Sequence, residues 1–125
     1  MNNRLSIVFL VLALILGACS KKPDTAENQD PFNAFEISKD FIKDNLTEPA
    51  VATAKWPPFS DPNCKAIFDK ESQLWIVKSY VDADAQNIIR IRARMNYTVK
   101  LKYIGNAQWQ LIDWNWTGLS IIKKA

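Results

Sequence analysis

The sequence predicts an α+β fold in which one N-terminal amphipathic helix packs on an antiparallel sheet of roughly four strands. Two patterns support this prediction. Apolar residues recur every three or four positions over residues 31–46, and they alternate strictly with polar residues over 89–103. Turn-forming residues separate three further segments of strand-like composition. Residues 31–125 are predicted to form a single α+β domain, because a segment of this length buries one core.

The predicted helix covers residues 31–46. Asp30 supplies a side-chain acceptor at the N-cap, and Pro31 follows at the first helical position, which favours proline. The apolar face contains Ala34, Ile37, Phe41 and Ile42, with Phe35 and Leu46 beside it. Pro49 ends the helix, because the residue before a proline avoids the helical region. Charged side chains occupy the other side, so the helix is expected to cover one face of the sheet.

Residues 49–63 hold four prolines and are predicted to form a loop, from which Trp56 and Phe59 fill the edge of the core. Strands are predicted over residues 64–68, 74–83, 89–103 and 109–119. The third strand exceeds the usual length, so a bend or bulge is expected inside it, near Asn96. A cystatin-like or nuclear-transport-factor-like curved sheet is the nearest analogous shape.

The turn after the long strand sets the register of the last strand. A three-residue loop, Gly105–Ala107, places Trp109 opposite Tyr103 and Leu111 opposite Leu101, so that the apolar faces match. A two-residue loop would instead turn polar residues of the last strand toward the core, because a slip of one residue inverts every side chain. Burial therefore favours the three-residue loop.

On this register, alternation places two tryptophans on the same face as the basic residues of the long strand. The predicted binding face consists of Arg90, Arg92, Arg94, Lys100, Lys102, Trp114 and Trp116. Guanidinium groups make cation–π contacts with indole rings, and Trp and Arg are enriched in binding hot spots. We therefore predict a recognition surface for an acidic protein loop, a glycan or a lipid headgroup. The alternative is a solvated face whose tryptophans cover a second small core or are capped by residues 120–125.

The ionisable residues limit the chemistry of the chain. It has 16 basic residues, 13 acidic residues and no histidine, which is the commonest general base and metal ligand. Residues 64–125 hold 10 basic and 5 acidic residues, which favours an anionic partner. The sequence has no nucleophile elbow, phosphate-binding loop or metal-ligand spacing. We therefore predict no catalytic residue, no metal and no cofactor other than lipid.

Two smaller features have a structural interpretation. Asp82 and Asp84 could together hold a divalent cation, but no third ligand is close in sequence, and a solvated turn is the preferred interpretation. Cys64 is expected to be a buried thiol that behaves as a small apolar residue.

The first 20 residues have the layout of a secretory signal. Arg4 precedes an apolar run over residues 5–16, which is too short to span a bilayer, and small residues follow it. The motif Leu16-Gly17-Ala18-Cys19 resembles the lipobox of bacterial lipoproteins. The resemblance implies that residues 1–18 are a signal peptide. It also implies that Cys19 becomes the first residue of the mature protein and carries a diacylglyceryl group and an N-acyl chain.

The same resemblance implies a location in the bacterial cell envelope. Ser20 after the cysteine favours the outer membrane over the inner membrane. Residues 19–30 are then the lipidated cysteine and a polar, flexible tether with a reach of about 20 Å. The membrane is therefore an expected partner, and nucleic acid is not.

A second resemblance concerns the domain. It is carried by residues 46–52 (LTEPAVA), 56–57 (WP), 77–83 (VKSYVDA), 86–87 (QN), 94–99 (RMNYTV) and 109–111 (WQL). Together these resemble a small domain found in uncharacterised bacterial and phage-associated proteins, some of them lipoproteins or membrane-tethered. The resemblance covers residues 35–119 and implies a domain without implying an activity.

These observations predict a membrane-anchored envelope lipoprotein whose domain is a non-catalytic binding module. Its partner is expected to be another envelope protein or an anionic surface component. An exclusion or immunity role is one form of this prediction, by analogy with small lipoproteins encoded by phages and plasmids. Two alternatives are a small periplasmic enzyme or enzyme inhibitor with a pocket between helix and sheet, and a structural subunit of an envelope assembly.

Overall fold

The computed structural model describes residues 22–85 and 91–124. Within these ranges the chain forms helices α2 (Pro31–Lys43) and α3 (Ala50–Thr53) and strands β1 (Lys65–Asp69), β2 (Leu74–Asp84), β3 (Ile91–Gly105) and β4 (Gln108–Lys124). The strands form one antiparallel sheet in the order β1-β2-β3-β4. The α+β class and the four-stranded antiparallel sheet agree with the prediction.

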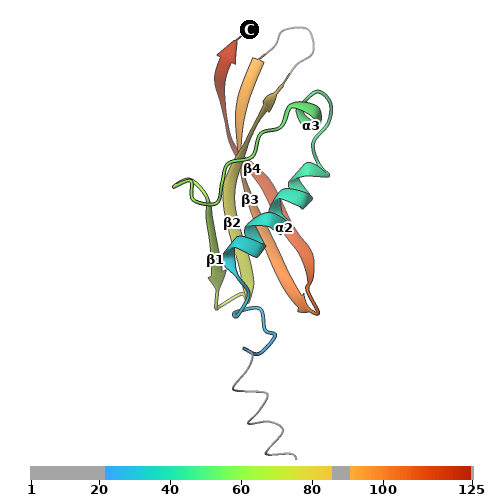
Figure 1. Cartoon of the computed structure of the whole chain (residues 1–125), viewed down its shortest axis with the longest axis vertical. Coiled ribbons are helices and arrows are strands. Elements are labelled where there is room, and N and C mark those ends of the chain that lie inside the picture. Colours follow the sequence, from blue (N-terminus) through green and yellow to red (C-terminus); the bar gives the residue numbers. More distant parts are fainter. Residues whose placement is uncertain (1–21, 86–90, 125) are drawn as a thin grey trace, which may run out of the picture.

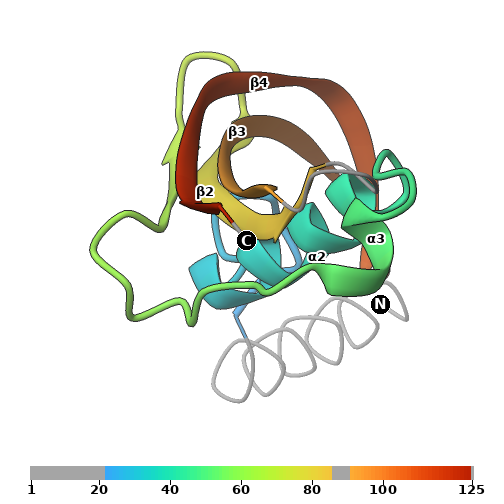
Figure 2. The same ribbon diagram turned by 90° about the horizontal axis from the view of Figure 1, so that it is seen from above.

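The sheet curls around α2, which lies across its concave side (Figures 1 and 2). We call the face that carries α2 the inner face and the opposite face the outer face. The described chain begins at the end of the sheet where the β3–β4 turn lies, and it finishes at the other end (Figure 1). In the part of the chain that the structure describes, no helix combines the length and the apolar character needed to cross a bilayer.

Helix α2 begins as the sequence predicts. The Asp30 side chain accepts a hydrogen bond of 3.0 Å from the backbone N–H of Phe32, and Pro31 is the first helical residue. The helix ends at Lys43, three residues earlier than predicted. Asn45 accounts for part of this difference, because its side-chain amide donates 2.8 Å to the Phe41 carbonyl and satisfies an acceptor of the last turn.

The core lies between α2 and the inner face. Its buried members are Ala34, Phe35, Ile42, Cys64, Trp75, Val77, Tyr97, Val99 and Leu101. Trp56 and Phe59 pack against this cluster from the loop before β1, as the sequence predicts. Phe59 contacts the ring of Phe35 at 5.1 Å between centroids. The helix is therefore held on the sheet mainly by apolar burial.

The β3–β4 turn differs from the predicted three-residue loop. Gly105 pairs with Gln108, so the turn consists of Asn106 and Ala107. Both have positive φ, 53° and 59°, as a type I′ turn requires. Ile104 has no partner in β4 and forms a bulge, which shifts the register by one residue.

This bulge produces the register that burial requires. Trp109 lies opposite Tyr103 and Leu111 opposite Leu101, which confirms the predicted pairs. Further along the ladder, three residues of β4 have no partner in β3, namely Ile112, Thr117 and Ile122. The irregularity expected near Asn96 is therefore present, but the extra residue belongs to β4.

Residues 24–29 lie against the end of the sheet. The Asp24 carboxylate accepts 2.6 Å from the Tyr103 hydroxyl and 3.0 Å from the backbone N–H of Asn106. The indole N–H of Trp75 donates 2.7 Å to the Ala26 carbonyl. This corrects the predicted tether: from Asp24 onward the segment belongs to the folded domain. Residues 1–21, which include the predicted signal peptide and Cys19, lie outside the described residues.

Candidate functional site

The residues of the predicted binding face do not lie together. The basic residues Arg92, Arg94, Lys100 and Lys102 follow β3 on the outer face, because the residues that alternate with them point into the core. The two tryptophans lie on the inner face, and Arg90 lies outside the described residues. The predicted combination of arginine and tryptophan on one surface is therefore wrong.

The β4 bulge at Ile112 explains the misplaced tryptophans. Strict alternation from Leu111 would put even-numbered residues on the outer face, but one extra residue inverts the pattern. Trp114 thus lies opposite Val99 and packs against the core, and Trp116 lies opposite Tyr97. The Trp114 and Trp116 rings are 5.4 Å apart and perpendicular. Trp114 thus extends the main core, whereas the Trp116 ring contacts that of Tyr97 and stays 39% exposed.

Arg94 is bound inside a cluster on the outer face. Its guanidinium donates two hydrogen bonds of 2.9 Å to the two carboxylate oxygens of Asp82 and lies 3.9 Å from the centre of the Tyr80 ring. The Tyr80 hydroxyl donates to the carboxylate of Asp61, which ties the loop before β1 to β2. This hydrogen bond, together with burial, raises the pKa of Tyr80 to about 12. Arg94 therefore stabilises the fold and is not free to bind a partner.

Arg92 is also occupied within the domain. Its guanidinium lies 3.2 Å from an oxygen of Asp84 and donates to the backbone carbonyls of Thr53 and Asp82. Asp82 and Asp84 are thus strand residues, and each faces an arginine of β3. The interpretation of this pair as part of a solvated turn is therefore wrong. In residues 22–85 and 91–124 no group of three acidic or cysteine residues could hold a metal ion.

Four lysines on the outer face remain exposed, and we call them the outer lysine cluster: Lys65, Lys78, Lys100 and Lys102. Lys65 lies opposite Lys78 in the β1–β2 ladder, and Lys100 lies opposite Ile76 of β2. Opposite residues in a sheet have Cβ atoms about 5 Å apart. No ion pair of these lysines is found among the described residues. The cluster therefore presents positive charge to solvent from three neighbouring strands, beside one exposed carboxylate, Asp113 of β4, which lies opposite Lys100.

Two hollows lie on this surface, and Lys78 lines both. One, of about 390 Å³, is lined by Lys65, Ile67, Phe68, Asp69, Ile76 and Lys78. The other, of about 320 Å³, is lined by Asn63, Lys78, Ser79, Asn96, Tyr97, Thr98 and Thr117. The first combines apolar side chains with two ammonium groups and the Asp69 carboxylate, and the second offers amides and hydroxyls beside an ammonium group. Such a surface can bind anionic groups by charge and orient them by hydrogen bonds.

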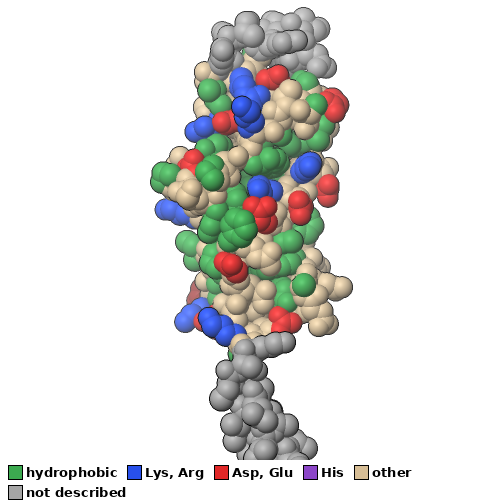
Figure 3. Space-filling view, viewed as in Figure 1, with side chains coloured by type: hydrophobic (Ala, Val, Ile, Leu, Met, Phe, Trp, Pro, Cys, Tyr) green, Lys and Arg blue, Asp and Glu red, His purple; other side chains and the backbone are tan. Residues whose placement is uncertain are grey.

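The outer lysine cluster contains two residues that sequence reasoning missed. Lys65 and Lys78 lie on β1 and β2, and only the register between these strands brings them together with Lys100. The side that carries α2 looks different, because acidic and basic side chains are interspersed there (Figure 3).

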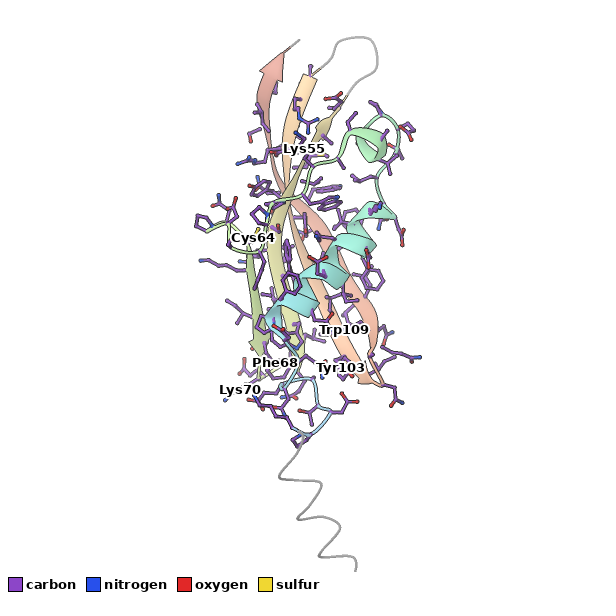
Figure 4. All side chains as sticks on the ribbon, in the orientation of Figure 1. Lys55, Cys64, Phe68, Lys70, Tyr103 and Trp109 are labelled. Atoms are coloured by element: carbon purple, nitrogen blue, oxygen red, sulfur yellow. The ribbon has the colours of Figure 1, made fainter. Side chains whose placement is uncertain are left out.

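Cys64 is buried beside β2, as predicted (Figure 4). Its Sγ lies 3.1 Å from the hydroxyl of Ser79, and burial raises the pKa of the thiol. A thiol that is both buried and protonated is a poor nucleophile. Cys64 therefore has the structural role that its sequence context suggests.

The pocket between helix and sheet that an enzyme or inhibitor would need is filled. Phe35 and Ile42 of α2 meet Tyr97 and Leu101 of β3 there, and all four side chains are almost fully buried. The hollows described above open instead to the outer face. The geometry of the described residues thus favours a binding surface over an enclosed reaction site.

Comparisons of the chain with protein-family models, with curated proteins and with solved structures give no match.

Proposed function

We propose that this chain is an envelope lipoprotein, anchored through a lipidated Cys19, whose domain binds an anionic envelope component without catalysis. The observation that carries the binding role is the outer lysine cluster, which has no ion pair among the described residues. The partner is proposed to be an acidic segment of another envelope protein. Interfaces of this kind gain specificity and association rate from charge complementarity.

The lipobox motif Leu16-Gly17-Ala18-Cys19 supports the proposed anchor. Asp24, which binds the β3–β4 turn, is five residues after Cys19. Five extended residues span at most about 18 Å. With lipid on Cys19, the turn end of the sheet would therefore lie close to the membrane surface. The short connection would limit how far the domain can move from the bilayer.

We also propose a finer description of the shape. One helix seated on the concave side of a curled antiparallel sheet supports the analogy with cystatin-like domains (Figure 2). The filled interface between helix and sheet supports a use of the outer surface for binding in preference to the concave side.

The binding proposal is tested by charge reversal in the full chain. Lys78→Glu with Lys100→Glu should abolish capture of the partner from envelope extracts, because two central charges of the cluster become repulsive. Lys43→Glu with Lys55→Glu changes the net charge equally on exposed residues outside the cluster and should leave capture intact. Equal capture by both double variants would exclude the lysine surface.

The anchor is tested separately. Cys19→Ser should prevent lipid attachment, and the chain should no longer be found as a processed protein in the membrane fraction. Mass spectrometry of the wild-type protein should show an acylated amino-terminal cysteine. A wild-type chain that keeps an unmodified Met1 would overturn the anchor, whatever the outcome of the charge reversal.

A further inference from the structure

Strand β4 has an unpaired edge. It is the last strand in the sheet order and, within the described residues, it pairs with β3 alone over Gln108–Lys124. The other edge of a strand in this position carries backbone N–H and C=O groups that can accept a further strand. Soluble proteins normally protect such an edge with charged residues, proline, a covering segment or bulges.

The C-terminal half of β4 is apolar and exposed. The exposed large apolar residues of this half are Trp116, Leu119, Ile121 and Ile122, and Leu119 exposes 69% of its surface. A shallow hollow of about 490 Å³ lies along the same stretch, lined by Met95, Trp116, Thr117, Gly118 and Leu119. Contiguous exposed apolar surface of this kind marks interaction sites.

The stretch from Trp114 to Ile122 carries no ionisable side chain. When a strand pairs antiparallel with a copy of itself, residues near the two-fold axis lie opposite or diagonal to their own counterparts, so like charges there would repel across the interface. An uncharged apolar strand has no such penalty and is self-complementary. The charge pattern therefore favours a second copy over a charged partner at this edge.

The amino-terminal segment is a poor alternative occupant. Asp24 is held at the β3–β4 turn, and Leu119 lies twelve residues along β4 from Ala107, or about 40 Å at strand spacing. After cleavage before Cys19, the three residues ahead of Lys22 would span only about 11 Å. This step rests on the proposed processing, whereas the preceding steps do not.

We propose that two copies of this chain associate through antiparallel pairing of their β4 edges, with the two-fold axis near Leu119. Such an interface is isologous, since the same surface of each copy contacts the other. Leu119 then faces its own counterpart, and Gly118 lies opposite Ser120 of the other copy. The bulges at Thr117 and Ile122 confine regular pairing to the short stretch between them. Apolar contacts of Trp116, Leu119 and Ile121 supply the rest of the interface.

The axis can be tested with single cysteines in the full chain. Directly opposite residues of antiparallel strands have Cα atoms about 5 Å apart, which suits a disulfide. Leu119→Cys should therefore form an intermolecular disulfide under mild oxidation in membranes, while native Cys64 is buried and remains unreactive. Ile112→Cys, on the same strand and 45% exposed, is the matched control. It would lie about 45 Å from its own counterpart and should not crosslink.

The outcomes separate the alternatives. Selective crosslinking at position 119 supports the proposed axis, and equal crosslinking at both positions indicates random collision and overturns it. No disulfide at position 119 also overturns it. Leu119→Lys should halve the particle mass in detergent solution, with the protein still folded by circular dichroism, and an unchanged mass would contradict the proposal. Lys78→Glu with Lys100→Glu should leave the dimer intact. A failure of the proposed binding function can therefore be distinguished from a failure of the proposed dimer.

Discussion

Asp24 accepts a hydrogen bond of 2.6 Å from the hydroxyl of Tyr103, a residue 79 positions further along the chain. The second carboxylate oxygen of Asp24 accepts from Asn106, and the Tyr103 hydroxyl accepts from Ala107 at 2.9 Å. Tyr103 and Asn106 at one hairpin end are thus joined to the segment that precedes α2, and Ala107 is joined to it through Tyr103. These contacts help to hold Asn106 and Ala107 at positive φ, a conformation that costs free energy for residues other than glycine.

The Asp24 contacts make the stability of the fold decrease at acidic pH. The hydrogen bond from Tyr103 and then that from Asn106 lower the pKa of Asp24. A lowered pKa stabilises the fold above the ordinary carboxyl pKa of about 4, and that contribution is lost as pH falls through and below this value. Asp24→Asn should therefore lower Tm at pH 7 and reduce the fall in Tm between pH 7 and pH 3.5. Glu71→Gln, at an exposed turn residue, is the control. A wild-type acid dependence in Asp24→Asn would contradict this assignment.

The Tyr80–Asp61 contact predicts an opposite dependence in alkali. The pKa of Tyr80 is about 12 in the folded chain and about 10 in an unfolded one. A raised pKa stabilises the fold fully below pH 10, and this contribution is lost between pH 10 and 12. Ultraviolet titration should show one tyrosine ionising near pH 12, and Asp61→Asn should bring it toward 10. Titration of that tyrosine near 10 in the wild type would exclude the contact.

Arg94 should not be replaceable by lysine. Lysine keeps the charge but loses the two parallel hydrogen bonds to Asp82 and the planar contact with the Tyr80 ring. The site is partly exposed, so we expect Arg94→Lys to cost about 1 kcal/mol in the free energy of unfolding. Urea denaturation measures this difference. Lys102→Arg, on the same face of β3 but exposed, should change it little.

The placement of Trp114 on the inner face has a measurable consequence. Trp114→Ala removes an indole that packs against the core and should cost about 2–4 kcal/mol in the free energy of unfolding. Loss of a solvated surface tryptophan would cost well under 1 kcal/mol. Urea denaturation with Lys100→Ala as the surface control distinguishes the two. A small effect in Trp114→Ala would contradict the bulge at Ile112.

Cys64 should react with thiol reagents only when the domain opens. Its thiol is buried and its pKa is raised, so the folded chain offers little thiolate. Labelling by a disulfide reagent at pH 8 should be slow in native buffer and fast in urea. Rapid labelling under native conditions would show that the packing of Cys64 against Ser79 is incorrect.

Local patterns in the sequence determined much of the fold. The period of the apolar residues predicts α2 and the four strands, and Asp30 and Pro31 predict where α2 begins. The pairing of Tyr103 with Trp109 follows from burial, since only that register matches the apolar faces. Each of these features depends on neighbours in sequence or on the burial of one apolar face.

Only the tertiary structure decided which side chains share a surface. The extra residue at Ile112 inverts the faces of the residues from Asp113 to Trp116, until a second extra residue at Thr117 restores the pattern, and nothing in the local sequence marks either position. The joining of Lys65 with Lys78, and of Asp24 with Tyr103, likewise depends on contacts between distant segments. Periodicity reports on each strand alone, whereas a binding surface is assembled from several, so the candidate site could not be obtained from alternation alone.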